Sequence, residues 1–425
     1  MKKLFIAFIV ILNSCSEINY MNPFLEEYNT PYQIPPFEKI KNTHYLPAFT
    51  QGMKEQLEEI NLIVQNKESP SFENTIVEME RIGKTLDKVS SVFFNLNSSN
   101  TNDEMDSIAR EIRPKLSAHR DAIFLNKKLF NRVMKVYEER NNLNLTTEQK
   151  RLVEETYKYF IRSGAQLNPD EMEKLTEINQ ELSSLTVQFD QNLLKETNEG
   201  FQLVIEEEKQ LDGLPQDFID QAAKLAESEG FSGKWLFKPT RVSMYPFLTY
   251  STQRDLREKL YKSYIKRGDN DNERDNKDIA IKMSDLRRLR ANLLGFETHA
   301  DFVLDNTMAK NTHRVKNLLD QVWKPGLNRA KKEAQEMQEV IQGEGSNFNL
   351  EAWDWWYYSE KIRQLKYDFS EEEIKPYFEE SKVLQGAFDV ATKLFDITFH
   401  ERFDLPKYRE NIRTFEVKTT NNEVI

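Results

Sequence analysis

Apolar positions recur at steps of three and four along most of the chain, which is the period of an amphipathic α-helix. The clearest example begins with Asn168 as a helix N-cap and Pro169 at the first helical position. One apolar stripe then follows, made of Leu175, Ile178, Leu182, Leu185, Phe189 and Leu193. The pattern predicts a long helix that ends near Gly200.

The same period predicts helices elsewhere, with few interruptions. It runs from residue 255 to a C-cap at Gly295, broken by a polar loop over 268–276, and returns over 310–342, 349–367 and 381–395. Three segments instead favour β structure: 201–207, 240–250 with Pro246 as a breaker, and the alternating segment 412–418.

The end of the sequence resembles an interrupted hairpin. Turn residues 419–422 follow the alternating segment, and residues 423–425 begin a returning strand. A hairpin that stops there exposes an unpaired apolar edge. We therefore expect this sequence to be the amino-terminal portion of a longer protein.

The composition supports a mainly α fold. Only 13 glycines and 14 prolines occur in 425 residues, about half the usual share of about 12%, so turn-rich β-sandwiches and barrels are disfavoured. We expect a large multi-helix protein with a few short β segments. Residues 31–240 form an amino-terminal helical region in this prediction, and residues 241–425 begin a second helical lobe that is incomplete at its carboxyl end.

Residues 1–14 have the layout of a secretory signal, with two lysines, an apolar run and then small polar residues. The segment LNSC, residues 12–15, resembles a bacterial lipoprotein box and contains the single cysteine of the chain. A plain signal peptide with an incidental cysteine is the alternative. We predict that Cys15 is lipidated and that residues 15–30 form a tether. The protein would then be anchored to a membrane of the bacterial cell envelope and face the periplasm or the surface.

The charge balance argues against a nucleic-acid partner. The chain has 59 basic and 70 acidic residues and a net charge of −11, so no overall cationic field attracts phosphates. The sequence also has no glycine-rich phosphate loop and no Gly-x-Ser-x-Gly nucleophile motif. Nucleotide-binding and serine-hydrolase functions lose their main support.

The five histidines lack the spacing of a helical zinc site, which requires two histidines four residues apart. His400, Glu401 and Asp404 would place ligands on one face of a helix, but no further ligand accompanies them. His299 and Asp301 have the pattern of a capped pair at a helix start. We expect no zinc to be bound by this chain alone.

The densest aromatic segment is WDWWYYSEKIR, residues 353–363. In helical register Trp353, Trp356 and Tyr357 share one face, and Trp355, Ser359 and Ile362 lie on another. One interpretation is a helix buried between two layers. The other is a helix that lines a ligand channel, with Trp353, Trp356, Tyr357 and Tyr358 as the lining residues.

Several long segments carry a resemblance to a known family. They include residues 22–49, SFENTIVEMERIG (71–83), LRRLRANLLGFETHADFVL (286–304) and the aromatic segment with its continuation to residue 378. These segments resemble segments of the thimet oligopeptidase family of zinc metallopeptidases and occur in the same order. The resemblance is specifically to the bacterial peptidyl-dipeptidase (dipeptidyl carboxypeptidase) branch of that family. The resemblance covers residues 22–425.

The resemblance implies a helical ellipsoid of two halves around a deep channel with zinc at its floor. It also implies short peptide substrates, release of carboxyl-terminal dipeptides, and a monomer when the protein is complete. The family's His-Glu-x-x-His motif and its other catalytic residues correspond to positions beyond Ile425. The chain is therefore expected to contain no catalytic and no metal-binding residue, to be inactive alone, and to need zinc only in the complete protein.

Two functions remain open from the sequence. In the first, the chain is the non-catalytic amino-terminal portion of a zinc-dependent peptidyl-dipeptidase or oligopeptidase that acts on short peptides. In the alternative, it is a non-catalytic helical lipoprotein that binds peptides or a protein partner.

Overall fold

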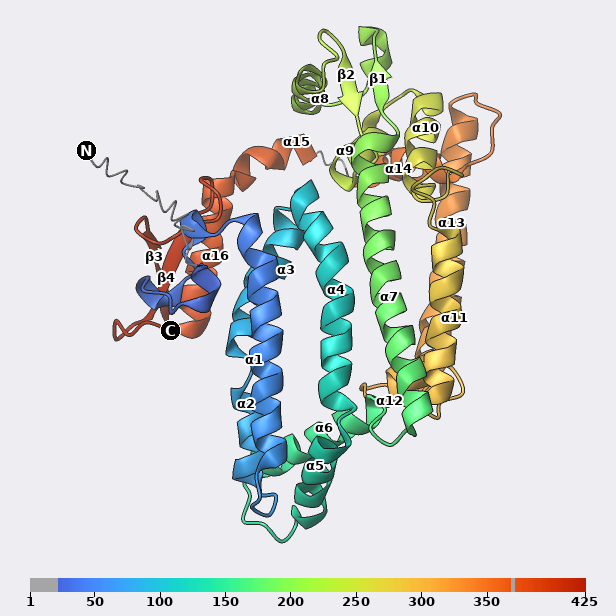
Figure 1. The fold of residues 1–425 in the computed structure, drawn as a ribbon. Helices are drawn as coiled ribbons and strands as arrows, with labels where there is room; N and C mark the ends of the chain where they lie inside the picture. Colours follow the sequence, from blue (N-terminus) through green and yellow to red (C-terminus); the bar gives the residue numbers. More distant parts are fainter. Residues whose placement is uncertain (1–21, 368–370) are drawn as a thin grey trace, which may run out of the picture.

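The computed structural model describes residues 22–367 and 371–425. The predicted signal peptide, Cys15 and the first part of the tether lie outside the described residues. Helices dominate the described part of the chain, with two small antiparallel sheets, and the predicted mainly α fold is confirmed (Figure 1). Within that part, none of the helices combines the length and the apolar character needed to cross a bilayer.

The amino-terminal region is a set of packed helices. Four single 3-10 turns between Pro23 and His44 lead into α1 (Tyr45–Gln65). A π-turn (Phe72–Val77) and five helices follow: α2 (Glu78–Arg81), α3 (Lys84–Ser99), α4 (Asp103–Phe124), α5 (Lys127–Glu139) and α6 (Thr147–Arg162). One apolar core lies around Phe49 and Phe93 between α1, α3 and α4, and a second lies around Val133 and Phe160 near α5 and α6.

The long predicted helix is confirmed as α7 (Pro169–Lys195), and a π-turn carries the chain from there to Gly200. Its first turn is a capping box in which Asn168 and Glu171 satisfy each other's backbone N–H groups. Its apolar stripe packs against α11 (Lys277–Leu293), where Leu182 contacts Met283 and Leu286 in one cluster. Helix α7 lies between α4 and α11 (Figure 1).

A compact unit sits at the carboxyl end of α7. It contains β1 (Leu203–Ile205), α8 (Gln216–Ser228), β2 (Trp235–Phe237), α9 (Arg241–Tyr250) and α10 (Arg254–Ile265). Strand β1 pairs antiparallel with β2, with Val204 opposite Leu236. Their apolar cluster includes residues from both sides of position 240, and the domain boundary placed there stays a prediction.

The β structure predicted for residues 240–250 is wrong, because most of that segment is helix α9 with Pro246 inside it. Met244, Phe247 and Leu248 are buried against the β1–β2 unit, and their spacing of three and four suits a helix. This burial outweighs the β-propensity of the segment and the cost of an interior proline.

The remaining described elements extend from α12 (His299–Asp305) to the end of the chain. They are α13 (Thr312–Gly343), a 3-10 turn (Ala352–Asp354), α14 (Trp355–Tyr367), α15 (Glu371–Ile374), a 3-10 turn (Lys375–Phe378), α16 (Glu380–Phe395), β3 (Ile397–Arg402) and β4 (Thr414–Thr419). The helices predicted over 310–342 and 381–395 are confirmed, and the helix predicted from residue 349 begins only at Trp355.

The predicted strand near residue 414 is confirmed as β4, and its main partner is β3, with Phe399 opposite Val417. The returning strand is also present as a short bridge, because the Ile425 N–H donates to the Val417 carbonyl at 3.1 Å. Phe388 of α16 stacks on Phe399 with ring centroids 4.2 Å apart. This sheet lies beside the first described residues, where the Phe37 and Tyr408 rings are 5.8 Å apart (Figure 1).

Candidate functional site

The aromatic segment joins two layers of the fold. Trp353 and Trp356 pack into the cluster of α9 and α10, with the Trp356 ring 6.1 Å from the Tyr261 ring. Tyr358 is buried in a separate cluster with Met337 of α13. The segment therefore contacts both layers, and Tyr358 is the buried residue of α14. The interpretation as a helix buried between layers and the channel-lining role of Trp353, Trp356, Tyr357 and Tyr358 both stay predictions.

The predicted face of Trp353, Trp356 and Tyr357 is wrong in one member. Trp353 belongs to the 3-10 turn, and Tyr357 packs with Trp355 on the α13 side. Trp356 and Tyr357 are consecutive residues of α14, so their side chains lie about 100° apart around the helix axis and reach different clusters.

A buried ion cluster anchors the start of α14. The Asp354 carboxylate accepts a bond from Arg257 at 2.8 Å, and it accepts bonds from both Nη2 and Nε of Arg254, at 2.8 Å and 3.1 Å. Asp354 and Arg257 are 0% and 1% exposed, and the Arg257 guanidinium lies 4.2 Å from the centre of the Tyr357 ring. Ion pairs from two arginines and the stacking of Arg257 on Tyr357 form a structural cluster, which holds α14 on α10.

The helical arrangement assumed for His400, Glu401 and Asp404 is wrong, because His400 and Glu401 lie in β3 and Asp404 follows it. Neighbouring strand residues point to opposite faces, so the two side chains diverge. Arg413 pairs with Glu401 at 2.6 Å and Arg402 pairs with Asp404 at 2.7 Å. His299 and Asp301 start α12 under a Thr298 cap, as predicted.

Among residues 22–367 and 371–425, no three His, Cys, Asp or Glu side chains come close enough together to hold a metal ion. The described residues therefore do not fit the zinc that the family resemblance implies.

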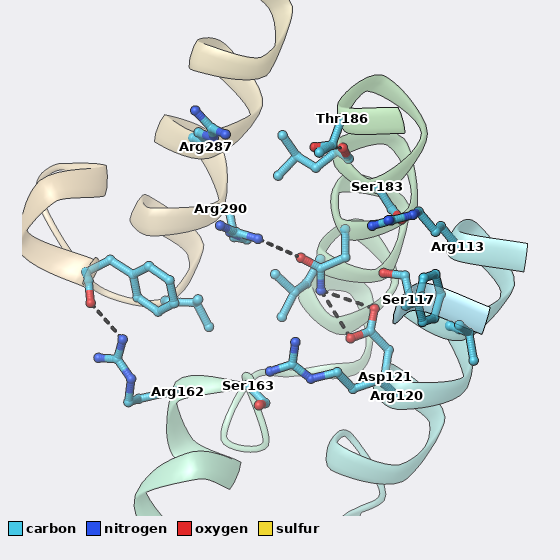
Figure 2. A pocket seen from close by; sticks show the side chains of 17 residues that line it. Arg113, Ser117, Arg120, Asp121, Arg162, Ser163, Ser183, Thr186, Arg287 and Arg290 are labelled. Atoms are coloured by element: carbon cyan, nitrogen blue, oxygen red, sulfur yellow. Dashed lines mark hydrogen bonds between the residues drawn. The ribbon is translucent and has the colours of Figure 1, made fainter. Parts of the chain in front are cut away.

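The most distinctive cavity lies between α4, α7 and α11, and the end of α6 and α12 close one side of it (Figure 2). Its volume is about 490 Å³, within the range of small-molecule sites, about 300–1,000 Å³. Five arginines line it: Arg113 and Arg120 from α4, Arg162 at the end of α6, and Arg287 and Arg290 from α11. Asp121 is the single acidic residue of this lining.

Asp121 is held by a neutral partner. The Asn179 amide donates to both of its carboxylate oxygens at 3.1 Å, and the side-chain oxygen of Asn179 faces Arg290 at 3.5 Å. Burial raises the pKa of Asp121, against the opposing effects of Asn179, Arg120 and Arg290. Burial also lowers the pKa of Arg290, and Arg287 and Arg120 lower it further by repulsion.

Sequence reasoning missed this cavity. The spacing of Arg113, Ser117 and Arg120 does place them on one face of a helix. Nothing in the sequence shows that this face meets Arg287 and Arg290, about 170 positions later, because only the packing of α4 and α11 on α7 brings the two groups together.

Comparison with known proteins gives the family. Residues 247–425 match the family model described as Peptidase family M3. Over 398 residues the chain is 36% identical to dipeptidyl carboxypeptidase of Escherichia coli (strain K12). The aligned region covers 93% of this chain and 58% of that protein. This chain is a relative of the M3 peptidases. The resemblance to the thimet oligopeptidase family is confirmed.

Other M3 relatives give the same picture. The chain is 35% identical over 397 residues to dipeptidyl carboxypeptidase of Salmonella typhimurium, with 93% of this chain and 58% of that protein covered. It is 30% identical over 407 residues to oligopeptidase A of Escherichia coli, with 95% and 59% covered. This chain thus spans less than two thirds of the length of these curated relatives.

Proposed function

We propose that this chain forms the non-catalytic amino-terminal portion of a zinc-dependent peptidyl-dipeptidase that acts on short peptides. The observation that carries the proposal is the 36% identity to E. coli dipeptidyl carboxypeptidase, which extends over 93% of this chain. In this proposal the complete protein supplies the zinc site and works as a monomer. Trp353, Trp356, Tyr357 and Tyr358 contribute to the wall of its peptide channel.

An exposed apolar surface on α13 supports the proposal that this chain is part of a larger folded protein. The first half of α13 exposes an apolar group formed by Leu318, Leu319, Val322 and Trp323, each 59–67% exposed. Their spacing forms one stripe along the helix. A contiguous apolar stripe of this kind is typical of a surface that another protein segment covers.

A chimera tests the proposal directly. The part of E. coli dipeptidyl carboxypeptidase that follows the matched region is joined after Ile425 of this chain. We expect the chimera to release carboxyl-terminal dipeptides from short peptides, to lose that activity with a chelator and to regain it with zinc. The chain ending at Ile425 and the isolated E. coli segment serve as controls. A folded, zinc-loaded chimera without peptidase activity would contradict the proposal.

The alternative is a helical lipoprotein that binds peptides without cleaving them. The uncompensated arginines between α4 and α11 favour this alternative for acidic peptides, because they offer charge-assisted hydrogen bonds to carboxylates. Equilibrium dialysis of the chain with labelled acidic and basic tetrapeptides separates the two functions. Tight binding by the chain alone, together with an inactive chimera, would place the alternative first.

Membrane anchoring through Cys15 is part of the same proposal. It rests on the LNSC segment and on the single cysteine of the chain. In a bacterial host, intact-mass analysis of the membrane fraction should show an acylated amino-terminal Cys15. A Cys15→Ala variant should leave the membrane fraction, and an unchanged distribution of that variant would contradict lipidation.

A further inference from the structure

The cavity between α4, α7 and α11 has an excess of positive charge that the described residues do not neutralise. Arg162 is paired, since it donates to Asp305 at 2.7 Å and to the Phe302 carbonyl at 2.8 Å. In the described part of the chain, no carboxylate lies within ion-pair distance of Arg113, Arg120 or Arg287.

Two of the unpaired arginines, Arg113 and Arg120, lie over aromatic rings. The Arg113 guanidinium lies 4.8 Å from the centre of the Phe94 ring, and the Arg120 guanidinium lies 5.1 Å from that of Tyr159. Arg290 has a buried Nε–H without a hydrogen-bond acceptor. Ring contacts orient a guanidinium but leave its N–H groups free to donate.

Arg120 and Arg287 are exposed at the cavity, and Arg113, Arg162 and Arg290 are half-buried. Their like charges repel one another, and the unmet buried Nε–H of Arg290 costs free energy. Only Asp121 opposes the arginines inside the cavity, and its two oxygens already accept bonds from Asn179. A ligand that brings negative oxygens into this space would relieve both costs.

We propose that this cavity is a binding site for a small oxyanion that carries two or more negative charges. Guanidinium groups converge on it from α4 and α11, so separate oxygens of one compact ligand can be bound from two sides. Ser117 of α4 and Ser183 of α7 add hydroxyl donors to the lining. This ligand class covers both phosphate-type and polycarboxylate anions. The site is independent of the proposed peptidase activity.

The experiment compares two arginines that are neighbours on α11. Arg287 lines the cavity, while Arg288 faces solvent and pairs with Asp285 at 3.5 Å. Wild-type chain, Arg287→Gln, Arg290→Gln and Arg288→Gln are titrated calorimetrically with pyrophosphate and, separately, with citrate. Sodium chloride at matched ionic strength is the control. Thermal unfolding of the same samples reports whether each variant folds.

We expect wild type and Arg288→Gln to bind at least one of the two anions with the same affinity to within about twofold, and Arg287→Gln to bind about tenfold more weakly because one charge-assisted contact is lost. Binding of pyrophosphate alone would assign a phosphate-type ligand, and binding of citrate alone a polycarboxylate. Without ligand, Arg287→Gln should melt at a higher temperature than wild type, because repulsion is reduced.

Two results would overturn the proposal. One is the absence of binding heat and of thermal stabilisation with both anions in the wild-type chain. The other is an equal loss of affinity in Arg287→Gln and Arg288→Gln, since that would show attraction to general surface charge rather than binding in the cavity.

Discussion

Asp354 shows how much a single residue can contribute to this fold. We expect Asp354→Asn to lower the free energy of unfolding by about 3–5 kcal/mol, because Arg257 would be left buried without a countercharge. Urea denaturation measures this value. Asp285→Asn, which removes an exposed partner of Arg288, should change stability by less than about 0.5 kcal/mol. Equal urea midpoints for the two variants would contradict the structural role of Asp354.

His119 gives the protein a pH-dependent stability. It is buried in α4 with Nε2 2.7 Å from the Gln56 side-chain oxygen, and burial lowers its pKa. The unfolded chain therefore takes up this proton more readily than the folded chain. Above about pH 6.5, the ordinary pKa of histidine, His119 is neutral in both states and does not change the free energy of unfolding. Below about pH 6.5 the unfolded chain is protonated first, so the free energy of unfolding falls by up to about 1.4 kcal/mol per pH unit.

We expect His119→Gln to remove this part of the pH dependence. Unfolding free energies at pH 7.5 and pH 5.5 should differ less in the variant than in the wild-type chain. His313→Gln, which removes an exposed imidazole at the start of α13, is the control. An identical loss of stability on acidification in wild type and His119→Gln would refute the assignment.

Close packing between α1 and α3 depends on one glycine. A Cβ added at Gly52 would lie 2.8 Å from the backbone nitrogen of Leu86. We expect Gly52→Ala to separate the two helices and to destabilise the chain by about 1–3 kcal/mol. Gly326 in α13 has open space around the same position, so Gly326→Ala should stabilise by about 0.5–1 kcal/mol. If Gly52→Ala and Gly326→Ala shifted the melting temperature in the same direction, this difference between the two sites would be contradicted.

The whole molecule exposes the apolar stripe of α13 that includes Leu319 and Trp323. We expect the chain alone to self-associate through this stripe at micromolar concentrations, because burying it removes apolar surface from water. Light scattering after size-exclusion chromatography should show smaller species for the double variant Leu319→Glu, Trp323→Glu. Ile281→Glu on α11, also an exposed apolar residue, is the control. The same mass for all three proteins would contradict the role of α13.

Local signals in the sequence determined the helical class and much of its detail. The Asn168 cap and the apolar stripe after it predicted α7. The alternation over 412–418 predicted β4, and turn residues 419–422 predicted the short return that ends at Ile425. These features were accessible because caps, helical periodicity and turns depend on residues only a few positions apart. The same local signals, in long ordered segments, carried the family resemblance.

Tertiary structure decided what depends on distant residues. Tertiary packing makes residues 241–250 helical and pairs β4 with β3. It also brings Arg254 and Arg257 into ion pairs with Asp354, about 100 positions away. It also assembled the arginine cavity from three separate helices. Local propensity differs by only about 1 kcal/mol per residue between helix and strand. Burial of a large apolar side chain contributes about 1.5–3 kcal/mol, so long-range packing decides wherever the two conflict.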